Sequence, residues 1–279
     1  MAHESANRPG ILETLWGASN RATWGIRERL AFRRRVRGVR PVPRGDLLRG
    51  LADPERAALH LDTWLSPLGI DATLLTAEAS WARDALDILA ALEVAIACLP
   101  GPLPDPLRVA DIGAKTWHYI RGVHALLSRG PAGPRRVALT GLEIDAFRVY
   151  RDFHSRWDWA HWHAAPCPGS RYLALDALAF REPQDLVLLF LPILFLEEHL
   201  DWGLSLGQYR PEALFRHARI LAGARGHVVM LNFAYEEPLL DRLAEAQEVP
   251  PLLRVPAPAA LEEGELPRIL TVWPGLLAT

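Results

Sequence analysis

Residues 109–115 read Val-Ala-Asp-Ile-Gly-Ala-Lys, and this short stretch sets the expectation for the rest of the chain. The apolar residues up to Ile112 predict a short buried strand, and Gly113 predicts a sharp turn directly after it. Asp111 lies near the end of that strand. Open parallel sheets bind their ligands at the carboxyl ends of their strands, so an acid and a turn at this point indicate a candidate site.

The same arrangement of an apolar strand followed by an acid occurs twice more. Residues 140–145 read Thr-Gly-Leu-Glu-Ile-Asp, and residues 173–177 read Leu-Ala-Leu-Asp-Ala. The strand-end acids Asp111, Glu143 and Asp176 are about 33 residues apart, which is the length of one strand-helix unit. We therefore expect the three acids at the same edge of one sheet.

Strand and helix patterns alternate through the whole C-terminal part of the chain. Strands are predicted at residues 108–112, 136–142, 172–175, 185–190, 227–232 and 268–272. Helices are predicted at residues 117–127, 144–153, 212–221 and 238–247. Alternating elements of this length are typical of right-handed βαβ units and a parallel sheet.

The N-terminal part of the chain is predicted to be helical and organised separately. Asp53 followed by Pro54 is a good helix start, and a second apolar stripe predicts a helix over residues 77–99. Residues 100–106, Pro-Gly-Pro-Leu-Pro-Asp-Pro, form a stiff linker. The expected division is an Arg-rich segment 1–50, a helical cap and Pro-rich linker 51–106, and a main domain 107–279.

The Arg-rich stretch from Arg21 to Arg49 has two interpretations. Arginines interleaved with Trp24 and Phe32 are typical of an arm that binds nucleic acid or an acidic partner. The same pattern fits a solvated helix followed by the turn Pro41-Val42-Pro43. A net charge of −2 predicts no overall attraction to nucleic acid, so nucleic acid is an unlikely partner.

Composition points to a cytoplasmic protein with no membrane segment. Cys98 and Cys167 are too few for a disulfide framework and match no zinc pattern. The longest apolar run, from Leu186 to Leu196, is too short to cross a bilayer and contains Pro192.

The three strand-end segments, in this order, resemble the motifs of class I S-adenosylmethionine (SAM) dependent methyltransferases over residues 108–272. The resemblance implies an α/β fold with a Rossmann-like, mostly parallel, seven-stranded type of sheet, helices on both faces and here an N-terminal helical extension. It also implies SAM as the cofactor. The resemblance further implies which residues bind SAM. They are Asp111, Gly113, Ala114 and Lys115 in the loop, Glu143 with Asp145 at the ribose, and Asp176 with Ala177 beside the adenine.

The chain departs from the family pattern in the turn. Glycines usually stand two and four places after Gly113, where this chain has Lys115 and Trp117. Either the loop takes another path or the methionine end of the pocket has changed. Lys115 then pairs with the SAM carboxylate or a phosphate, or simply faces solvent. The segment fits neither a dinucleotide-binding fingerprint nor a phosphate-binding Walker loop.

Substrate and catalytic residues are expected near the same strand ends. In amino-group methyltransferases, an Asn/Asp-Pro-Pro-aromatic turn after the fourth strand holds the target nitrogen. This chain has one proline of that turn, Pro192, but lacks the polar Asn or Asp residue. Trp117, His118, Tyr119 and Pro192 are expected to face substrate. Glu198 and His199 are candidates for a base, with an acidic helix start as the alternative.

Residues 147–163 are unusually rich in aromatic side chains and histidines. They are expected to line a pocket for a flat or apolar substrate, or to pack in the interior. His161 and His163 suggest a metal pair on an extended segment, but no third ligand is indicated, so no metal site is expected.

The leading interpretation is a methyltransferase acting on a small molecule, with residues 54–99 as a cap over the strand ends. Two alternatives stay open. One is a catalytically degenerate protein that keeps the fold as a binding or scaffold protein for a partner protein. The other is an RNA-directed methyltransferase that uses the Arg-rich arm.

Overall fold

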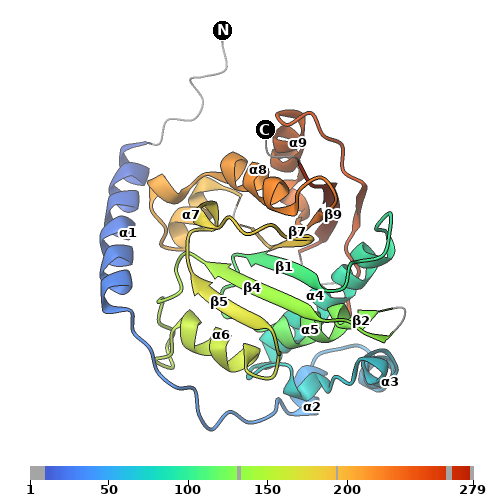
Figure 1. Cartoon of the computed structure of the whole chain (residues 1–279). Coiled ribbons are helices and arrows are strands. Elements are labelled where there is room, and N and C mark those ends of the chain that lie inside the picture. Colours follow the sequence, from blue (N-terminus) through green and yellow to red (C-terminus); the bar gives the residue numbers. More distant parts are fainter. Residues whose placement is uncertain (1–9, 131–132, 193, 262–265, 277–279) are drawn as a thin grey trace.

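The computed structural model describes residues 10–130, 133–192, 194–261 and 266–276, and these form a seven-stranded sheet with helices on both faces (Figure 1). The strand order is β5-β4-β1-β6-β7-β9-β8. The strands are β1 (Leu107–Ile112), β4 (Val137–Glu143), β5 (Ser170–Ala174), β6 (Leu186–Phe190), β7 (His227–Phe233), β8 (Leu253–Pro256) and β9 (Arg268–Pro274). A two-stranded ribbon, β2 (Arg129–Gly130) with β3 (Gly133–Pro134), lies apart from the sheet.

Five neighbouring strands of the sheet run parallel, and the two at one edge do not. β5, β4, β1, β6 and β7 pair in parallel, whereas β9 pairs antiparallel with both β7 and β8. The strand order reverses direction between β1 and β6, which is where ligands bind in open α/β sheets. The expected fold class is confirmed, and the six expected strands are all present.

Side chains alternate between two apolar cores on the two faces of the sheet. In β6, Leu186, Leu188 and Phe190 belong to one core, whereas Val187 and Leu189 belong to the other. Both faces of the strand are therefore covered, as its continuous apolar sequence predicts. The first core takes in α4 (Ala79–Ala97), α5 (Ile120–Leu127) and α6 (Arg156–Ala164), and the second takes in α8 (Pro211–Ala222) and α9 (Glu237–Glu245).

The helices of residues 54–99 do not form the expected cap over the strand ends. α4 packs on α5 and against β7 and β9, so it covers a face of the sheet. Its buried Leu86, Leu89 and Leu92 share one core with strand residues such as Leu188. α2 (Arg44–Leu47) packs on α4, and α3 (Pro54–Leu65) follows it in the chain. The Pro-rich segment 100–106 therefore joins two parts of a single core.

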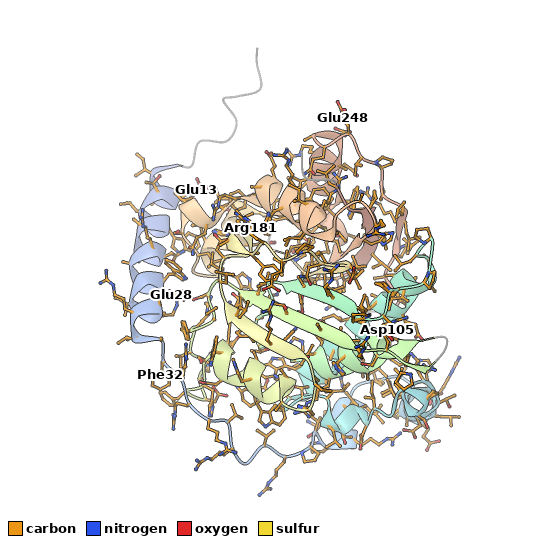
Figure 2. The ribbon with its side chains drawn as sticks, in the orientation of Figure 1. Glu13, Glu28, Phe32, Asp105, Arg181 and Glu248 are labelled. Carbon is orange, nitrogen blue, oxygen red and sulfur yellow. The ribbon has the colours of Figure 1, made fainter. Side chains whose placement is uncertain are left out.

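The element that lies beside the strand ends is α1 (Ile11–Leu30). Figure 1 shows it on the side to which the arrows of β1, β4 and β5 point, and Figure 2 marks its two ends by Glu13 and Glu28. α1 contacts α7 (Leu196–Asp201) and the 3-10 helix Leu206–Gln208. Gly17 permits this approach, because a Cβ there would lie 2.6 Å from Leu206 Cγ.

The helix expected at residues 144–153 begins later, at Arg156. Residues 144–153 form turns, and the short bridge between Val149 and Ser155 precedes the helix. Ser155 Oγ accepts a hydrogen bond from the backbone N–H of Asp158, whose carboxylate accepts one from the Ser155 backbone N–H. This capping box fixes the start of α6, because it satisfies two donors that a helix start leaves unpaired.

The described part of the chain contains no helix with both the length and the apolar composition that a membrane span requires.

Candidate functional site

A cavity opens at the carboxyl ends of β1, β4, β5 and β6, under α7 and the start of α8. Its empty space is about 910 Å³, a figure that includes the part open to solvent at the mouth. Most of its wall is apolar, with Leu142, Ile144, Leu175, Leu178, Leu189 and Leu214. The residues singled out from the sequence that line it are Gly113, Lys115, Glu143, Asp176, Ala177, Pro192 and His199.

The other residues singled out lie outside the cavity wall. They are Asp111, Ala114, Trp117, His118, Tyr119, Asp145 and Glu198. Trp117, His118 and Tyr119 are buried, and His118 faces α4, where its Nε2 lies 2.9 Å from Asp84 Oδ2. Of the four residues expected to face substrate, only Pro192 therefore reaches the cavity.

Glu143, the last residue of β4, is the buried acid on the cavity wall. Its Oε1 accepts hydrogen bonds from the Asp145 backbone N–H and from Arg156 Nη1, both at 2.9 Å. Its Oε2 accepts one from the backbone N–H of Lys115, also at 2.9 Å. A carboxylate has about four acceptor positions, so one position on Oε2 is left for a ligand.

Arg156 forms a buried ion pair with Glu143, and sequence reasoning missed it. Both side chains are about 5% exposed or less. Burial favours the neutral form of a guanidinium, but Glu143 and the neighbouring Tyr150 and Asp145 outweigh this effect and raise the pKa of Arg156. An arginine as the first residue of a helix opposes the helix dipole. An arginine directly after the helix-capping Ser155 is therefore the feature of the sequence that could have identified Arg156 as a candidate site residue.

The turn after β1 has the backbone conformation that glycine favours, but two of its residues are not glycine. Gly113, Lys115 and Trp117 have φ angles of +78°, +52° and +54°. A side chain in the left-handed region costs about 1–2 kcal/mol per residue. Helix formation is delayed to Ile120, three residues after the expected start at Trp117.

Trp117 fills space beneath this turn. Its ring is fully buried, its Nε1–H donates to Asp111 Oδ2 at 2.8 Å, and it packs on Gly141 of β4. A Cβ on Gly141 would lie 2.9 Å from Trp117 Cε2, so a glycine is required opposite this ring. Burial raises the pKa of Asp111 to about 7. Asp111 therefore anchors the turn from below.

Lys115 turns its side chain toward the aromatic wall of the cavity. Nζ lies 4.8 Å from the centre of the Trp202 ring. The Arg156 guanidinium lies 5.3 Å from the same centre. Burial, and next the charge of Arg156, lower the pKa of Lys115. Its side chain is thus half-buried over an aromatic ring, which excludes the fully solvent-facing alternative.

Asp176 stands at the end of β5 and also pairs with an arginine. Its Oδ2 accepts a hydrogen bond from Arg210 Nη2 at 2.5 Å, and its Oδ1 accepts one from the backbone N–H of Leu178 at 2.9 Å. Both Asp176 and Arg210 line the cavity, next to Ala177. This end of the cavity therefore combines a partly exposed carboxylate with an apolar floor.

Asp145 connects the site to α1. Its fully buried carboxylate accepts a hydrogen bond from Arg27 Nε at 2.9 Å, and Arg148 lies 3.8 Å away. Trp24 Nε1 of the same helix donates to the backbone oxygen of Ile144, and Asn20 Nδ2 donates to those of Leu200 and Leu204. α1 is therefore fastened to both segments that form the rim of the cavity.

The two candidate bases differ in position. Glu198 Oε1 accepts a hydrogen bond from the hydroxyl group of Tyr235 and lies away from the cavity. His199 lines the cavity, and its Nε2 lies 2.8 Å from the backbone oxygen of Ser205. Because the Ser205 backbone oxygen can only accept a hydrogen bond, Nε2 of His199 must carry the proton, and the lone pair of the neutral ring is on Nδ1. Burial lowers the pKa of His199, so the ring is neutral at pH 7.

The two histidines of α6 differ in burial: His161 is exposed, with its ring centre 4.2 Å from that of Trp157, whereas His163 packs in the interior. His163 is fully buried; its Nδ1 lies 2.8 Å from the backbone oxygen of Thr116 and its Nε2 lies 2.9 Å from Thr76 Oγ1. Burial lowers its pKa to about 3. The segment is helical, which corrects the extended conformation expected for His161 and His163. Among the described residues, no group of three potential ligands is placed to hold a metal ion.

Comparisons with known proteins identify the fold. No family model matches the sequence, and no curated protein matches it. A putative class I SAM-dependent methyltransferase from Listeria monocytogenes superposes with a TM-score of 0.50 at 13% identity, over 82% of this chain and 70% of the other. A SAM-dependent methyltransferase from Aquifex aeolicus gives a TM-score of 0.46 at 9% identity, over 67% and 92%. An rRNA methylase from Streptococcus thermophilus gives 0.40 at 10% identity, over 70% and 94%.

The chain therefore has the fold of the class I SAM-dependent methyltransferases, as the resemblance of its strand-end motifs implies. At this level of identity the likeness defines the fold alone.

Proposed function

We propose that this protein is a SAM-dependent methyltransferase that acts on a small molecule. One observation carries the proposal. Glu143 ends the strand next to β1, lies on the wall of a cavity at the strand ends, and keeps an acceptor position free on Oε2. This is the position of a carboxylate that receives ribose hydroxyl groups in the fold that the chain shares.

The residues of the cavity fit the nucleoside part of SAM. Glu143 would hold the ribose through its free acceptor position. The apolar floor near Leu142, Leu175 and Ala177 would cover the adenine, with Asp176 at its edge. When bound, SAM supplies an electrophilic methyl group. The protein's contribution is then to position the acceptor and to exclude water.

His199 would act as the base. Its neutral ring keeps Nε2–H on the backbone oxygen of Ser205, so Nδ1 is the atom that would take a proton from an acceptor hydroxyl or amine. The hydrogen bond to Ser205 fixes the orientation of the ring, as general base catalysis requires. Pro192 lies on the same wall and would contact the acceptor.

The enclosure of the cavity supports a small acceptor over an RNA. α1 contacts α7 beside the strand ends, and His199 of α7 lines the cavity. Arginines of the proposed arm are used within the chain. Arg27 pairs with Asp145, Arg44 pairs with Asp62, and Arg33 lies 4.3 Å from the centre of the Trp157 ring.

A second candidate function is a binding or scaffold protein that keeps the fold without catalysis. It is favoured by the Arg156–Glu143 pair, which occupies one oxygen of the ribose-binding carboxylate, and by the side chains of Lys115 and Trp117 in the turn. The partner would then be another protein.

Isothermal titration with SAM and with S-adenosylhomocysteine tests the proposal. Micromolar binding supports the methyltransferase, and no binding at millimolar ligand favours the scaffold. Glu143→Gln should weaken SAM binding by about 1–3 kcal/mol, the value of a charged hydrogen bond. Glutamine is preferred to alanine because it keeps a partner for Arg156. The control is Glu182→Gln, on an exposed side chain outside the cavity, which should leave the affinity unchanged.

A further inference from the structure

The polar wall of the cavity holds more cations than it needs to neutralise its acids. Lys115, Arg156 and Arg210 line it, together with the carboxylates of Glu143 and Asp176. Arg156 pairs with Glu143, and Arg210 pairs with Asp176. Within the described ranges, no carboxylate oxygen lies within 4.0 Å of Lys115 Nζ. One positive charge in the cavity is thus left over.

Arg156 has a donor without a hydrogen-bond acceptor in the part of the chain that the structure describes. Its Nη1 donates to Glu143, and its Nε lies 3.4 Å from the Tyr150 hydroxyl oxygen. Its Nη2 is buried and has no acceptor among the described residues, while the whole side chain is about 4% exposed. An unsatisfied buried donor on a charged group is costly, so such an atom usually faces a ligand or an ordered water.

The two incompletely satisfied cations share one neighbour. Lys115 Nζ and the Arg156 guanidinium lie 4.8 Å and 5.3 Å from the centre of the Trp202 ring, which also lines the cavity. Cation–π contacts hold the two groups in place but do not neutralise them. Two cations held together repel each other, and an anion between them would remove this repulsion.

We propose that Lys115 and Arg156 form an anion subsite beside Trp202, and that the ligand of the cavity places a carboxylate or phosphate group there. Lysine supplies a point charge, and the Nη2 of arginine supplies a directed donor, a combination suited to either group. The inference deepens the proposed function, on whose cavity it rests. The anion then belongs either to the methyl acceptor or to the amino-acid end of SAM.

The sequence offers a direct probe of this subsite, because Lys115 is the only lysine of the chain. Protein labelled with ¹³C at lysine Cε gives one lysine side-chain signal. Inorganic phosphate, titrated against chloride at constant ionic strength, should move this signal with saturation. A signal that responds to about 50 mM phosphate no more than to chloride would overturn the subsite, whatever SAM does.

Variants measured by calorimetry test whether Lys115 contributes to the phosphate affinity. Lys115→Met should weaken phosphate binding about tenfold or more, since it removes a charged hydrogen bond. Arg210→Met is the matched control: it removes the same charge from the same cavity, but from a group already paired with Asp176, and should change phosphate affinity about twofold at most. Equal losses in both variants would mean a general charge effect and would contradict the subsite.

Competition identifies the source of the anion. If SAM displaces phosphate from Lys115 and decarboxylated SAM does not, the subsite takes the carboxylate of SAM. If phosphate stays bound in the presence of SAM, the subsite belongs to the acceptor. Phosphate binding without any SAM binding would retain the subsite and reject the methyltransferase, so the two proposals fail independently.

Discussion

Replacing Arg156 by methionine should destabilise the protein strongly, because it leaves the Glu143 carboxylate buried without its charged partner. The two side chains are 4% and 5% exposed, and Arg156 Nη1 lies 2.9 Å from Glu143 Oε1. Breaking a buried pair by removing one partner costs about 3–5 kcal/mol. Glu143 keeps two backbone N–H donors, from Lys115 and Asp145, so we expect a loss near the lower end, about 3 kcal/mol.

The assay is a double-mutant cycle in urea at pH 7. With an m value of roughly 2–3 kcal/mol per molar urea, Arg156→Met should lower the unfolding midpoint by about 1 M. Glu143→Gln removes the charge, so the double variant should be more stable than the sum of the two single losses by about 1–3 kcal/mol. The exposed pair Arg44–Asp62 is the control, and Arg44→Met should cost about 1 kcal/mol at most. Losses at positions 143 and 156 that add to within about 0.5 kcal/mol would refute the coupling.

Three further results are expected. The pKa of His163 is about 3 when folded and 6.5 in its ordinary state, so between pH 7 and pH 5 the unfolded chain takes up a proton there that the folded chain does not. Wild type should therefore lose about 2 kcal/mol more of its free energy of unfolding over this range than His163→Gln does, as measured by urea melts at both pH values; the same change in both proteins would contradict the assignment to His163. Gly141→Ala should lower the free energy of unfolding by about 1–3 kcal/mol because its methyl group overpacks against Trp117, and the loss should be smaller in a Trp117→Phe background. An unchanged thermal midpoint would show that the Trp117 ring moves aside without cost. His199→Gln should lower kcat at least about a hundredfold with unchanged SAM affinity, and an undiminished kcat would remove His199 as the base.

The parallel sheet could be predicted from the sequence because each strand carries its own signal. The continuous apolar residues of β6, and the acids at the ends of β1, β4 and β5, are local features that do not depend on the rest of the chain. The edge strand β8 was not predicted. It has four residues, begins two residues after Pro251, and is defined mainly by its pairing with β9.

The candidate site could be predicted only in part. Glu143, Asp176 and Lys115 follow from their positions at strand ends, and they line the cavity. Arg156 and Trp202 could not be found in this way, because neither follows a strand end. Arg156 reaches Glu143, 13 residues earlier in the chain, and Trp202 reaches the cavity through its contact with Arg156. Conversely, Trp117 and His118 follow the turn directly but point into the core. Sequence proximity to a strand end places the backbone, whereas packing decides which way the side chain points.

The attachment of α1 has a consequence for how the protein is made. Its anchors lie far ahead in the chain: Asn20 bonds to Leu200 and Leu204, and Trp24 bonds to Ile144. α1 therefore cannot make all of these contacts until the chain has been synthesised as far as Leu204. Contacts of such long sequence separation form late in folding. The rim of the cavity consequently closes at a late stage, and a partly synthesised chain that ends before Leu200 has no closed site in which to bind a ligand.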